Sequence, residues 1–210
     1  MQTNNIPSLK NIPIRDILFA KFGVPIYIEN DANCYALGAS LAFSQDIDVP
    51  FIGITLGTGL GCGIVCNGRI IRGQHTSAGE IWQLPHNQNR FEELVSSKFF
   101  RAHDTNAKEC AELAEHGNHL AHQIFEEFAQ NLAHVLYYCY VTYDPHIICL
   151  GGSIAKSSHL FLERTKELLN EKLPESVKHS IHIYQRSESK TIILGTAQIA
   201  KISPLKNHGQ

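Results

Sequence analysis

The chain has 210 residues, of which 43% are hydrophobic and 18% are charged, and its formal net charge is −2 at pH 7. This length suffices for one large domain or two small lobes with a buried core, and the composition is that of an ordinary soluble globular protein. The near-neutral charge gives no electrostatic reason to expect nucleic acid or an anionic membrane as a partner, and no apolar stretch of the sequence reaches the roughly 18 residues of a membrane span.

The first residues and the cysteines bear on where the protein works. Residues 1–13 are polar, contain two prolines, and lack the basic start and apolar core of a signal peptide. The six cysteines lie in apolar or mixed sequence surroundings. Without a secretion signal, we expect reduced thiols and a cytoplasmic protein.

The first regular element is a helix predicted over 14–22, where apolar residues recur at helical spacing and Gly23 follows. Residues 24–28, VPIYI, are rich in β-branched and aromatic side chains and predict a short strand. Asp31 comes soon after them, and 32–43 suits a helix. An Asp or Asn at such a junction accepts hydrogen bonds from the free N–H groups of the first helical turn.

Glycine is unusually frequent between residues 51 and 72, where the pattern predicts an antiparallel meander. FIGITL and GCGIVC are predicted strands, with a Thr-Gly turn between them. Asn67-Gly68 is a strong signal for a two-residue hairpin, after which RIIR continues as a third strand. Residues 75–88 have no hydrophobic period and are predicted to form a loop.

Helices and strands alternate in the rest of the chain. Helices are predicted over 90–103 and, after Gly117, in a longer segment that Pro145 ends. The longer segment carries an apolar stripe made of Leu120, Ile124, Phe128, Leu132, Val135, Leu136 and Cys139. The remaining elements are a strand with two glycines, an amphipathic helix, a strand and a small-residue helix, at 146–153, 158–173, 180–187 and 194–202. This order predicts an α/β fold with a mixed sheet.

Two glycine motifs are candidates for binding phosphate. Gly57, Thr58 and Gly59 lie at the tip of the first hairpin and would offer backbone N–H groups and one hydroxyl to a phosphate. This motif is neither a P-loop nor a dinucleotide fingerprint, so a plain turn is the alternative. Gly151 and Gly152 lie between a strand and a helix, where a nucleotide can bind at the helix N-terminus, although many strand–helix connections have this form.

Two acidic residues are candidates for chemistry. Asp31 lies at the junction of a strand and a helix, where a helix cap is the commoner role. Glu80 lies in the long loop, where most glutamates are simply solvated. Neither residue by itself identifies a function.

Four motifs occur in the order YIENDAN, ITLGTGLGCGIVCNGRIIRG, SAGEI and DPHIICLGGSI. Together they resemble the ROK family of bacterial sugar kinases and repressors, over almost the whole chain, down to LGTAQIA near its end. The resemblance implies an α/β fold of the actin/hexokinase-like ATPase (ribonuclease H-like) type, in which ATP and sugar meet in the cleft between two lobes. It also implies that residues 1–30 are a remnant of the N-terminal lobe and hinge. Residues 31–210 would form the C-terminal lobe, whose last helix, about 194–203, returns toward the N-terminal lobe.

The resemblance also assigns roles to particular residues. Asp31 would be the catalytic base, accepting the proton of a sugar hydroxyl as that hydroxyl attacks the γ-phosphate of ATP. The implied sugar-binding positions are Asn30, Glu80 and Gln83. The implied nucleotide-binding positions are Gly57, Thr58 and Gly59 for the phosphates and Gly151 and Gly152 for the adenosine. Phosphoryl transfer needs mainly positioning and charge neutralisation, with Mg²⁺ on the phosphates.

The sequence departs from the family pattern in three places. No phosphate motif of the DxGGT type precedes YIENDAN, so the chain is expected to be N-terminally truncated. The family's GEIGH reads GEIWQ here, which places Trp82 and Gln83 where a glycine and a sugar-binding histidine stand in the family. The family's zinc-binding cysteine cluster is absent, so no structural zinc is expected.

The other potential metal ligands also predict no metal site. Cys62 and Cys66 are four residues apart in a strand, which places both on one face of the sheet. Three histidines recur at intervals of three near a helix start, at His116, His119 and His122. A solvated polar face is the simpler interpretation of these histidines, because no carboxylate or cysteine is spaced to complete a tetrahedral site.

Three functions remain open at this point. The first is an ATP-dependent sugar kinase acting on a hexose or an N-acetylated amino-hexose, with sugar and ATP as its ligands. The second is a catalytically impaired, truncated ROK relative that binds a sugar or a partner without turnover. The third is a sugar-responsive ROK regulator that lacks its DNA-binding domain. The resemblance further implies a homodimer or higher oligomer, with no nucleic-acid or membrane partner.

Overall fold

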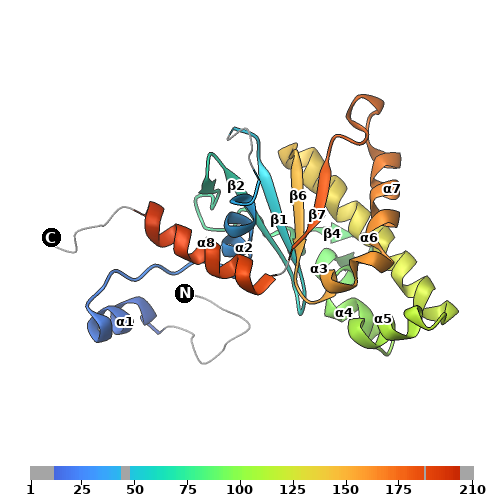
Figure 1. The fold of residues 1–210 in the computed structure, drawn as a ribbon, viewed down its shortest axis with the longest axis horizontal. Coiled ribbons are helices and arrows are strands. Elements are labelled where there is room, and N and C mark those ends of the chain that lie inside the picture. Colours follow the sequence, from blue (N-terminus) through green and yellow to red (C-terminus); the bar gives the residue numbers. More distant parts are fainter. Residues whose placement is uncertain (1–11, 44–47, 187, 204–210) are drawn as a thin grey trace.

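The computed structural model describes residues 12–43, 48–186 and 188–203 as a mixed α/β fold around one central sheet (Figure 1). The sheet has five strands in the order β3-β2-β1-β6-β7. Its strands are β1 (Phe51–Leu56), β2 (Leu60–Cys66), β3 (Arg69–Ile70), β6 (Ile147–Gly151) and β7 (His182–Gln185). A separate two-stranded sheet consists of β4 (Pro85–His86) and β5 (Asn89–Arg90).

The helices connect and cover these strands. The α-helices are α1 (Ile14–Phe22), α2 (Asp31–Ser40), α3 (Phe91–Leu94), α4 (Ser97–Ala102), α5 (Ala107–Glu115), α6 (His119–Tyr143), α7 (Leu162–Lys172) and α8 (Glu188–Ile202). Short 3-10 turns are η2 (Ile81–Gln83), η3 (Ile154–Leu160) and η4 (Glu175–Val177). No described helix combines the length and hydropathy that crossing a bilayer requires.

Both parallel and antiparallel pairs occur in the central sheet, which confirms the predicted mixed topology. β1 pairs antiparallel with β2, from Phe51 opposite Val65 to Leu56 opposite Leu60. β1 pairs in parallel with β6, and β6 pairs in parallel with β7. The carboxyl ends of β1, β6 and β7 therefore lie at the same edge of the sheet.

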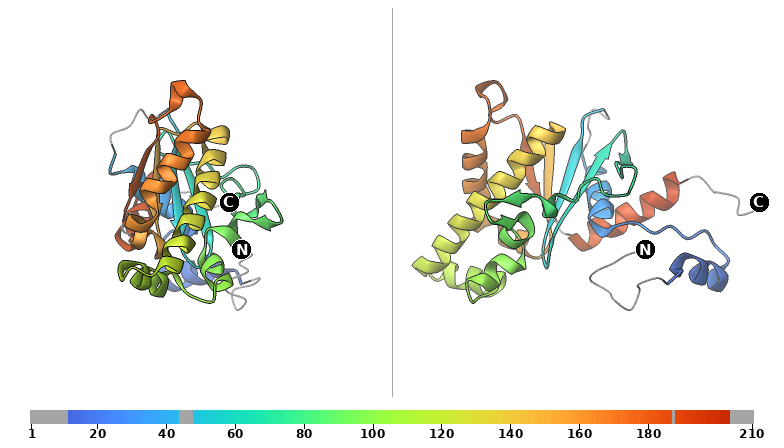
Figure 2. Two further views of the ribbon diagram at one scale, coloured as in Figure 1. Left: turned by 90° about the vertical axis from the view of Figure 1, so that its right-hand side faces the viewer. Right: turned by 180° about the vertical axis from the view of Figure 1, so that it is seen from behind.

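Two hydrophobic layers cover the two faces of the sheet (Figures 1 and 2). The helices α2 and α8 lie on one face, and α6 and α7, with the short helices α3 to α5, lie on the other. Strand residues alternate between the layers as a pleated strand requires. In β1, for example, Ile52 and Ile54 belong to the larger layer and Phe51 belongs to the smaller one.

Glycines let α2 lie directly on the backbone of β1 and β2. A Cβ atom built on Gly53 would lie 2.6 Å from the Ala36 Cα, and one built on Gly63 would lie 2.5 Å from the Ala32 carbonyl oxygen. Contacts this short leave no room for a side chain on either strand residue. Close packing of α2 thus explains part of the glycine-rich composition of the meander. The N-terminus of α2 lies toward the β1–β2 turn.

The structure confirms several predicted elements and corrects others. α1 spans the predicted residues and ends at Gly23, whose φ of 66° suits the left-handed helix cap. The prediction of a strand over 24–28 was wrong, because no described strand pairs with this segment. A lone extended segment has no partner for its backbone N–H and C=O groups. The third strand of the meander covers only Arg69–Ile70. In the predicted stripe of α6, Leu120 is exposed, whereas the other six residues are buried.

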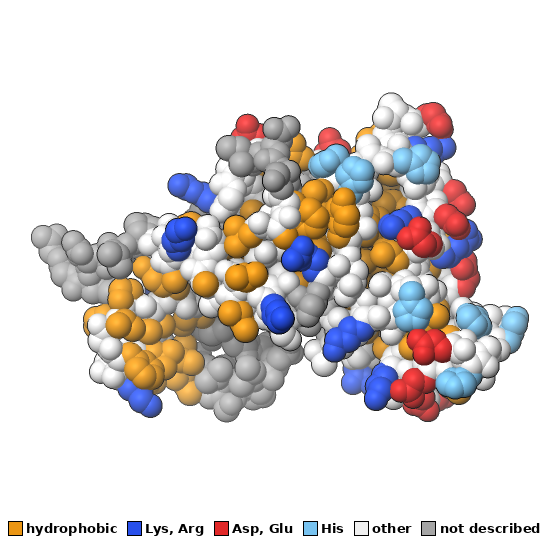
Figure 3. Space-filling view, viewed as in Figure 1, with side chains coloured by type: hydrophobic (Ala, Val, Ile, Leu, Met, Phe, Trp, Pro, Cys, Tyr) orange, Lys and Arg blue, Asp and Glu red, His pale blue; other side chains and the backbone are white. Residues whose placement is uncertain are grey.

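The end of the molecule that carries α1 and α8 exposes apolar side chains. α1 has no buried residue. Figure 3 shows hydrophobic atoms gathering over this end, on the left of the view. The large exposed side chains there are Ile17, Phe19, Phe22, Val24, Ile193 and Leu194. Exposed apolar surface of this kind favours association, and the expected homo-oligomer remains a prediction.

Candidate functional site

The two glycine motifs, distant in sequence, meet at the carboxyl edge of the sheet. Thr55, near the end of β1, pairs with Gly151, the last residue of β6. Gly152 follows with a φ of 93°, and a Cβ atom there would lie 2.2 Å from the Leu56 carbonyl oxygen. Gly57 lies beside Ser153, whose Oγ is 3.9 Å from a Cβ atom built on Gly57. Because β1 and β6 pair in parallel, the two predicted nucleotide-binding loops that follow them lie side by side.

The tip of the β1–β2 turn is tied to the start of α4. The Gly57 N–H donates to the Gly59 carbonyl at 3.1 Å, which closes the turn. Ser97 donates its N–H to the Gly57 carbonyl at 2.8 Å and its hydroxyl to the Thr58 carbonyl at 3.2 Å. The Thr58 side chain is exposed. The turn is thus held by its carbonyls from one side while the threonine side chain is accessible.

Asn30, and not Asp31, is the N-cap of α2. The Asn30 Oδ1 accepts from the N–H groups of Ala32 and Asn33, at 2.9 Å and 3.2 Å. Asp31 is the first helical residue and is exposed, and its Oδ1 accepts from the adjacent Ala32 N–H at 2.9 Å. Because a neighbouring asparagine caps the helix, the Asp31 carboxylate is left available at the surface.

The start of α2 lies against the beginning of β2. A Cβ atom on Gly61 would be 2.8 Å from the Ala32 Cβ. Gly61 is two residues beyond Gly59, the last residue of the glycine turn. The glycine at position 61 therefore permits the start of α2, which carries Asp31, to approach the strand that follows the predicted phosphate loop.

Glu29 and Arg72 form a link that sequence reasoning did not identify. The Glu29 Oε1 accepts from the Asn33 Nδ2 at 2.8 Å and from the Asn30 N–H at 3.0 Å, and its Oε2 pairs with the Arg72 Nε at 2.6 Å. The Glu29 side chain is only 11% exposed. This network fastens the segment before α2 to the chain after β3. The signal available in sequence was the first acid of the ENDAN motif, Glu29, but nothing local points to Arg72 as its partner.

The loop that carries Glu80 contacts the same part of β2. Gly79 has a φ of 88°, and a Cβ atom there would lie 2.4 Å from the Cys62 carbonyl oxygen. The Glu80 carboxylate is half-buried and accepts a hydrogen bond from the Trp82 Nε1. Asp31 and Glu80 are thus carried by segments that contact the neighbouring residues Gly61 and Cys62. The structure brings these two predicted site residues to the start of β2.

The two departures from GEIGH take different positions. Trp82 packs on the larger hydrophobic layer and donates to Glu80, so its indole supports that carboxylate. Gln83 ends the 3-10 turn η2 and is exposed. A glycine in place of Trp82 would lack this hydrogen bond, so the substitution gives Glu80 a partner within its own loop.

Cysteines and histidines are dispersed in the described chain. Among residues 12–43, 48–186 and 188–203, no three His, Cys, Asp or Glu side chains gather in a way that would hold a metal ion. Hydrogen bonding with Cys139 and burial raise the pKa of the Cys62 thiol, and the Glu80 charge adds to this. Cys66, on the same strand, lies near the surface and donates to the Asp48 carbonyl at 3.4 Å. The absence of structural zinc stays a prediction.

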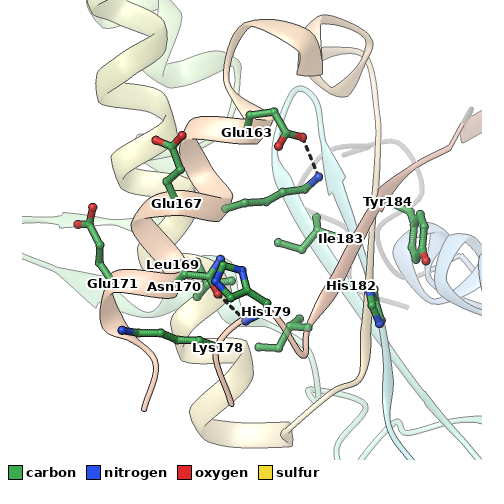
Figure 4. Close-up of a pocket in the computed structure, with 12 residues that line it drawn as sticks. Glu163, Glu167, Leu169, Asn170, Glu171, Lys178, His179, His182, Ile183 and Tyr184 are labelled. Atoms are coloured by element: carbon green, nitrogen blue, oxygen red, sulfur yellow. Dashed lines mark hydrogen bonds and ion pairs between the residues drawn. The ribbon is translucent and has the colours of Figure 1, made fainter. Parts of the chain in front are cut away.

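A cavity of about 640 Å³ lies between α7 and the outer edge of β7 (Figure 4). Charged and polar side chains line it together with Leu169, Ile181 and Ile183. Some of the polar side chains already have partners: Lys166 pairs with Glu163 at 2.8 Å, and Asn170 accepts from the His179 N–H at 2.9 Å. The cavity faces the amino end of β7, and none of the predicted site residues lines it. The carboxyl edge of the sheet is therefore the candidate site.

Comparison with known proteins points to one family. A model described as the ROK family matches residues 1–97 and 88–202. An N-acetyl-D-glucosamine kinase from Photobacterium profundum is 29% identical over 211 residues, which cover 87% of this chain and 67% of that protein. The chain spans about two thirds of the length of the curated relatives it matches, from 64% to 70%.

Solved structures share the fold. A putative sugar kinase from Cytophaga hutchinsonii superposes with a TM-score of 0.80 at 26% identity, over 94% of this chain and 73% of that one. A ROK hexokinase from Thermus thermophilus gives a TM-score of 0.75 at 25% identity, over 92% of this chain and 71% of that one. The predicted fold of the actin/hexokinase-like ATPase type is confirmed.

Proposed function

The chain belongs to the ROK family, and on this premise we propose that it acts in the ATP-dependent phosphorylation of a hexose or an N-acetylated amino-hexose. Its relatives support the substrate class, because they include an N-acetyl-D-glucosamine kinase and a fructokinase. The ROK hexokinase among the solved structures agrees with the same class.

One observation carries the proposal, which is the exposed carboxylate of Asp31 at the start of α2, a helix end that contacts the strand following the glycine turn. Asn30 caps α2, so Asp31 is not needed for that role. The amino end of a helix favours a negative charge, which helps to keep this carboxylate ionised and able to accept a proton. Its segment contacts β2 at Gly61, next to the loop proposed to bind phosphate.

The proposed reaction needs few groups from the protein. Asp31 accepts the proton of a sugar hydroxyl while the hydroxyl oxygen forms a bond to the γ-phosphorus of ATP. The bond from that phosphorus to the leaving oxygen breaks, and ADP leaves with the electron pair. The Mg²⁺ that accompanies ATP supplies charge neutralisation on the phosphates, which would hold it. Correct placement of the three reacting groups accounts for most of the expected rate enhancement.

Other residues would orient the two substrates. The Oδ1 of Asn30 is used in capping, so its Nδ2 is the atom proposed to donate to a sugar hydroxyl. Glu80 and the exposed Gln83 are proposed to complete the sugar site. The proposed nucleotide contacts are Gly57, Thr58 and Gly59 for the phosphates and Gly151 and Gly152 for the adenosine. The division of the chain into lobes at residue 30 likewise remains a proposal.

The test compares the wild-type chain with Asp31→Asn on a panel of hexoses and N-acetylated amino-hexoses, with ADP release coupled to a spectrophotometric signal. We expect Asp31→Asn to lose about 10²–10⁴-fold in kcat, because a positioned general base contributes that much. Asp16→Asn is the matched control, since Asp16 is also an acid in the first turn of a helix. It should leave the rate unchanged.

A negative result would be informative. If wild type and Asp31→Asn are equally silent on every sugar, the kinase proposal fails for this chain. Calorimetric binding of a sugar without turnover would then favour the alternative of a ROK protein that binds its ligand without catalysis.

A further inference from the structure

An ion pair flanks the glycine turn and has no role in the reaction described above. Lys98 in α4 pairs with Glu92 in α3, with 2.5 Å between the lysine Nζ and the Glu92 Oε2. The lysine side chain is 40% exposed and that of Glu92 is 23% exposed. The ammonium group is therefore accessible to a ligand while it keeps its partner.

The same carboxylate lies directly beside the turn. The Glu92 Oε1 is 2.9 Å from where a Cβ atom of Gly59 would be. A side chain at position 59 would strike this oxygen, so the glycine allows the carboxylate and the turn to approach each other. One oxygen of Glu92 thus lies against the turn while the other holds Lys98.

The segment between the two charges is held rigidly. The buried Ser96 hydroxyl donates to the Glu92 carbonyl at 2.5 Å and accepts from the Lys98 N–H at 3.2 Å. The next residue, Ser97, donates to the carbonyls of Gly57 and Thr58. The backbone that carries both charges is therefore connected to the turn by hydrogen bonds, and the ion pair with Glu92 holds the ammonium group near it.

This arrangement has an electrostatic consequence at a phosphate-binding turn. A bare carboxylate beside Gly59 would repel the phosphates of a nucleotide, because like charges at short range disfavour binding. The ammonium of Lys98 cancels that charge and offers N–H donors of the kind that phosphate oxygens accept strongly. A cation at this place therefore removes the repulsion that Glu92 alone would cause.

We propose that Lys98 is a phosphate-binding residue of the nucleotide site and that Glu92 positions it beside the Gly57–Gly59 turn. This inference rests on the proposed function, because it takes ATP as the ligand of the turn. It extends that function by naming a cation and its counter-charge as determinants of nucleotide affinity.

The experiment measures binding, so it does not depend on turnover. Calorimetric titration with Mg·ATP and with adenosine would be carried out at low salt on wild type, Lys98→Met, Glu92→Gln and the double variant. We expect Lys98→Met to weaken Mg·ATP binding about 10-fold or more, the usual size for loss of a charge-assisted hydrogen bond. Adenosine binding should stay within 2-fold of wild type, because adenosine carries no phosphate.

The double variant separates charge compensation from simple damage. Glu92→Gln combined with Lys98→Met should bind Mg·ATP at least about 3-fold more tightly than Lys98→Met alone, since the repelling carboxylate is gone. Lys166→Met is the matched control, because Lys166 is 34% exposed and pairs with Glu163 on α7. It should bind Mg·ATP as wild type does.

Different outcomes overturn different conclusions. Mg·ATP affinity of Lys98→Met within 2-fold of wild type would overturn this inference alone. A double variant no better than Lys98→Met would overturn it as well. Wild type that binds no Mg·ATP would overturn the proposed function and this inference with it.

Discussion

Three consecutive polar residues around the start of α2 have three different roles. Glu29 is tied to Arg72 and Asn33, Asn30 caps the helix, and Asp31 remains at the surface. An amide at position 30 satisfies the free N–H groups of the helix, and this frees the following carboxylate for other chemistry. Asp31, the proposed base, is thus available because Asn30 takes the capping role.

The pH dependence of stability is predicted from another residue, His134 on α6. Its ring lies 4.4 Å from that of His86, measured between centroids. Burial lowers the pKa of His134, the hydrogen bond from its Nδ1 to the Gln130 carbonyl opposes this, and the charges of Lys172 and His86 lower it further. Between the folded pKa and the unfolded value of about 6.5, the unfolded state binds more protons. Stability should therefore fall as pH drops below that value.

We expect His134→Gln to lose less free energy of unfolding than wild type when the pH is lowered from about 7.5 to about 5, because the substitution removes this titration. Urea unfolding at the two pH values provides the measurement. His119→Gln, at an exposed position on the same helix, is the control and should behave as wild type. An equal loss in wild type and His134→Gln would contradict the assignment to His134.

At the scale of elements, α2 is held between the sheet and α8 by small residues. A Cβ atom on Gly195 would lie 1.8 Å from the Cys34 carbonyl oxygen, and one on Gly38 would lie 1.9 Å from the Thr191 carbonyl oxygen. The two helices therefore cross with their backbones in contact. Because α2 carries Asp31, the position of the candidate base depends on this crossing and on the glycines of β1 and β2.

The close crossing of α2 and α8 predicts whether an alanine at position 195 stabilises or destabilises the protein. Alanine in place of glycine at an open helical position stabilises a helix by up to about 1 kcal/mol. Gly195→Ala should instead destabilise the protein by about 1–3 kcal/mol, since backbone atoms that cannot rotate away meet the new methyl group. Thermal and denaturant unfolding would measure this. Thr196→Ala, at the adjacent exposed position, adds no atom and serves as the control.

At the scale of the whole molecule, the central sheet lies between two hydrophobic layers of different size. The larger layer includes aromatic side chains from several helices, and the ring of Phe128 lies between those of Phe100 and Phe161, at centroid distances of 5.3 Å and 5.0 Å. The smaller layer binds α2 and α8 to the opposite face. The sheet edge that carries the glycine motifs therefore depends on packing from both sides.

Removing one aromatic ring from the larger layer should strongly reduce the stability of the protein. Phe128→Ala is expected to lower the free energy of unfolding by about 3–5 kcal/mol, because a fully buried phenylalanine leaves a cavity. Leu120→Ala on the same helix is the control, and its effect should stay within about 0.5 kcal/mol, since that side chain is 64% exposed. Urea unfolding followed by far-ultraviolet circular dichroism and by the fluorescence of Trp82 measures both.

Much of the fold could be predicted because its signals are local. Helical spacing located α1 and Gly23 ended it, and the Asn67-Gly68 pair marked a two-residue turn, where both residues have a positive φ. The order of the elements was enough to predict a mixed sheet. The motif at Asp31 was equally visible, since a strand-like run followed by polar residues and alanines indicates a helix start.

Other features depend on partners that lie far away in the chain. Residues 24–28 have strand composition but no strand to pair with, and Leu120 has the helical spacing of a core residue but nothing covering it. The sequence by itself determined the family, most of the helices and strands, and the residue types of the candidate site. Only the tertiary structure decided that Asn30 caps in place of Asp31, that Gly57 and Gly151 meet at one edge, and that Glu92 and Lys98 lie beside them. The reason is that composition and spacing act between near neighbours, whereas strand pairing and packing join residues that the chain itself keeps apart.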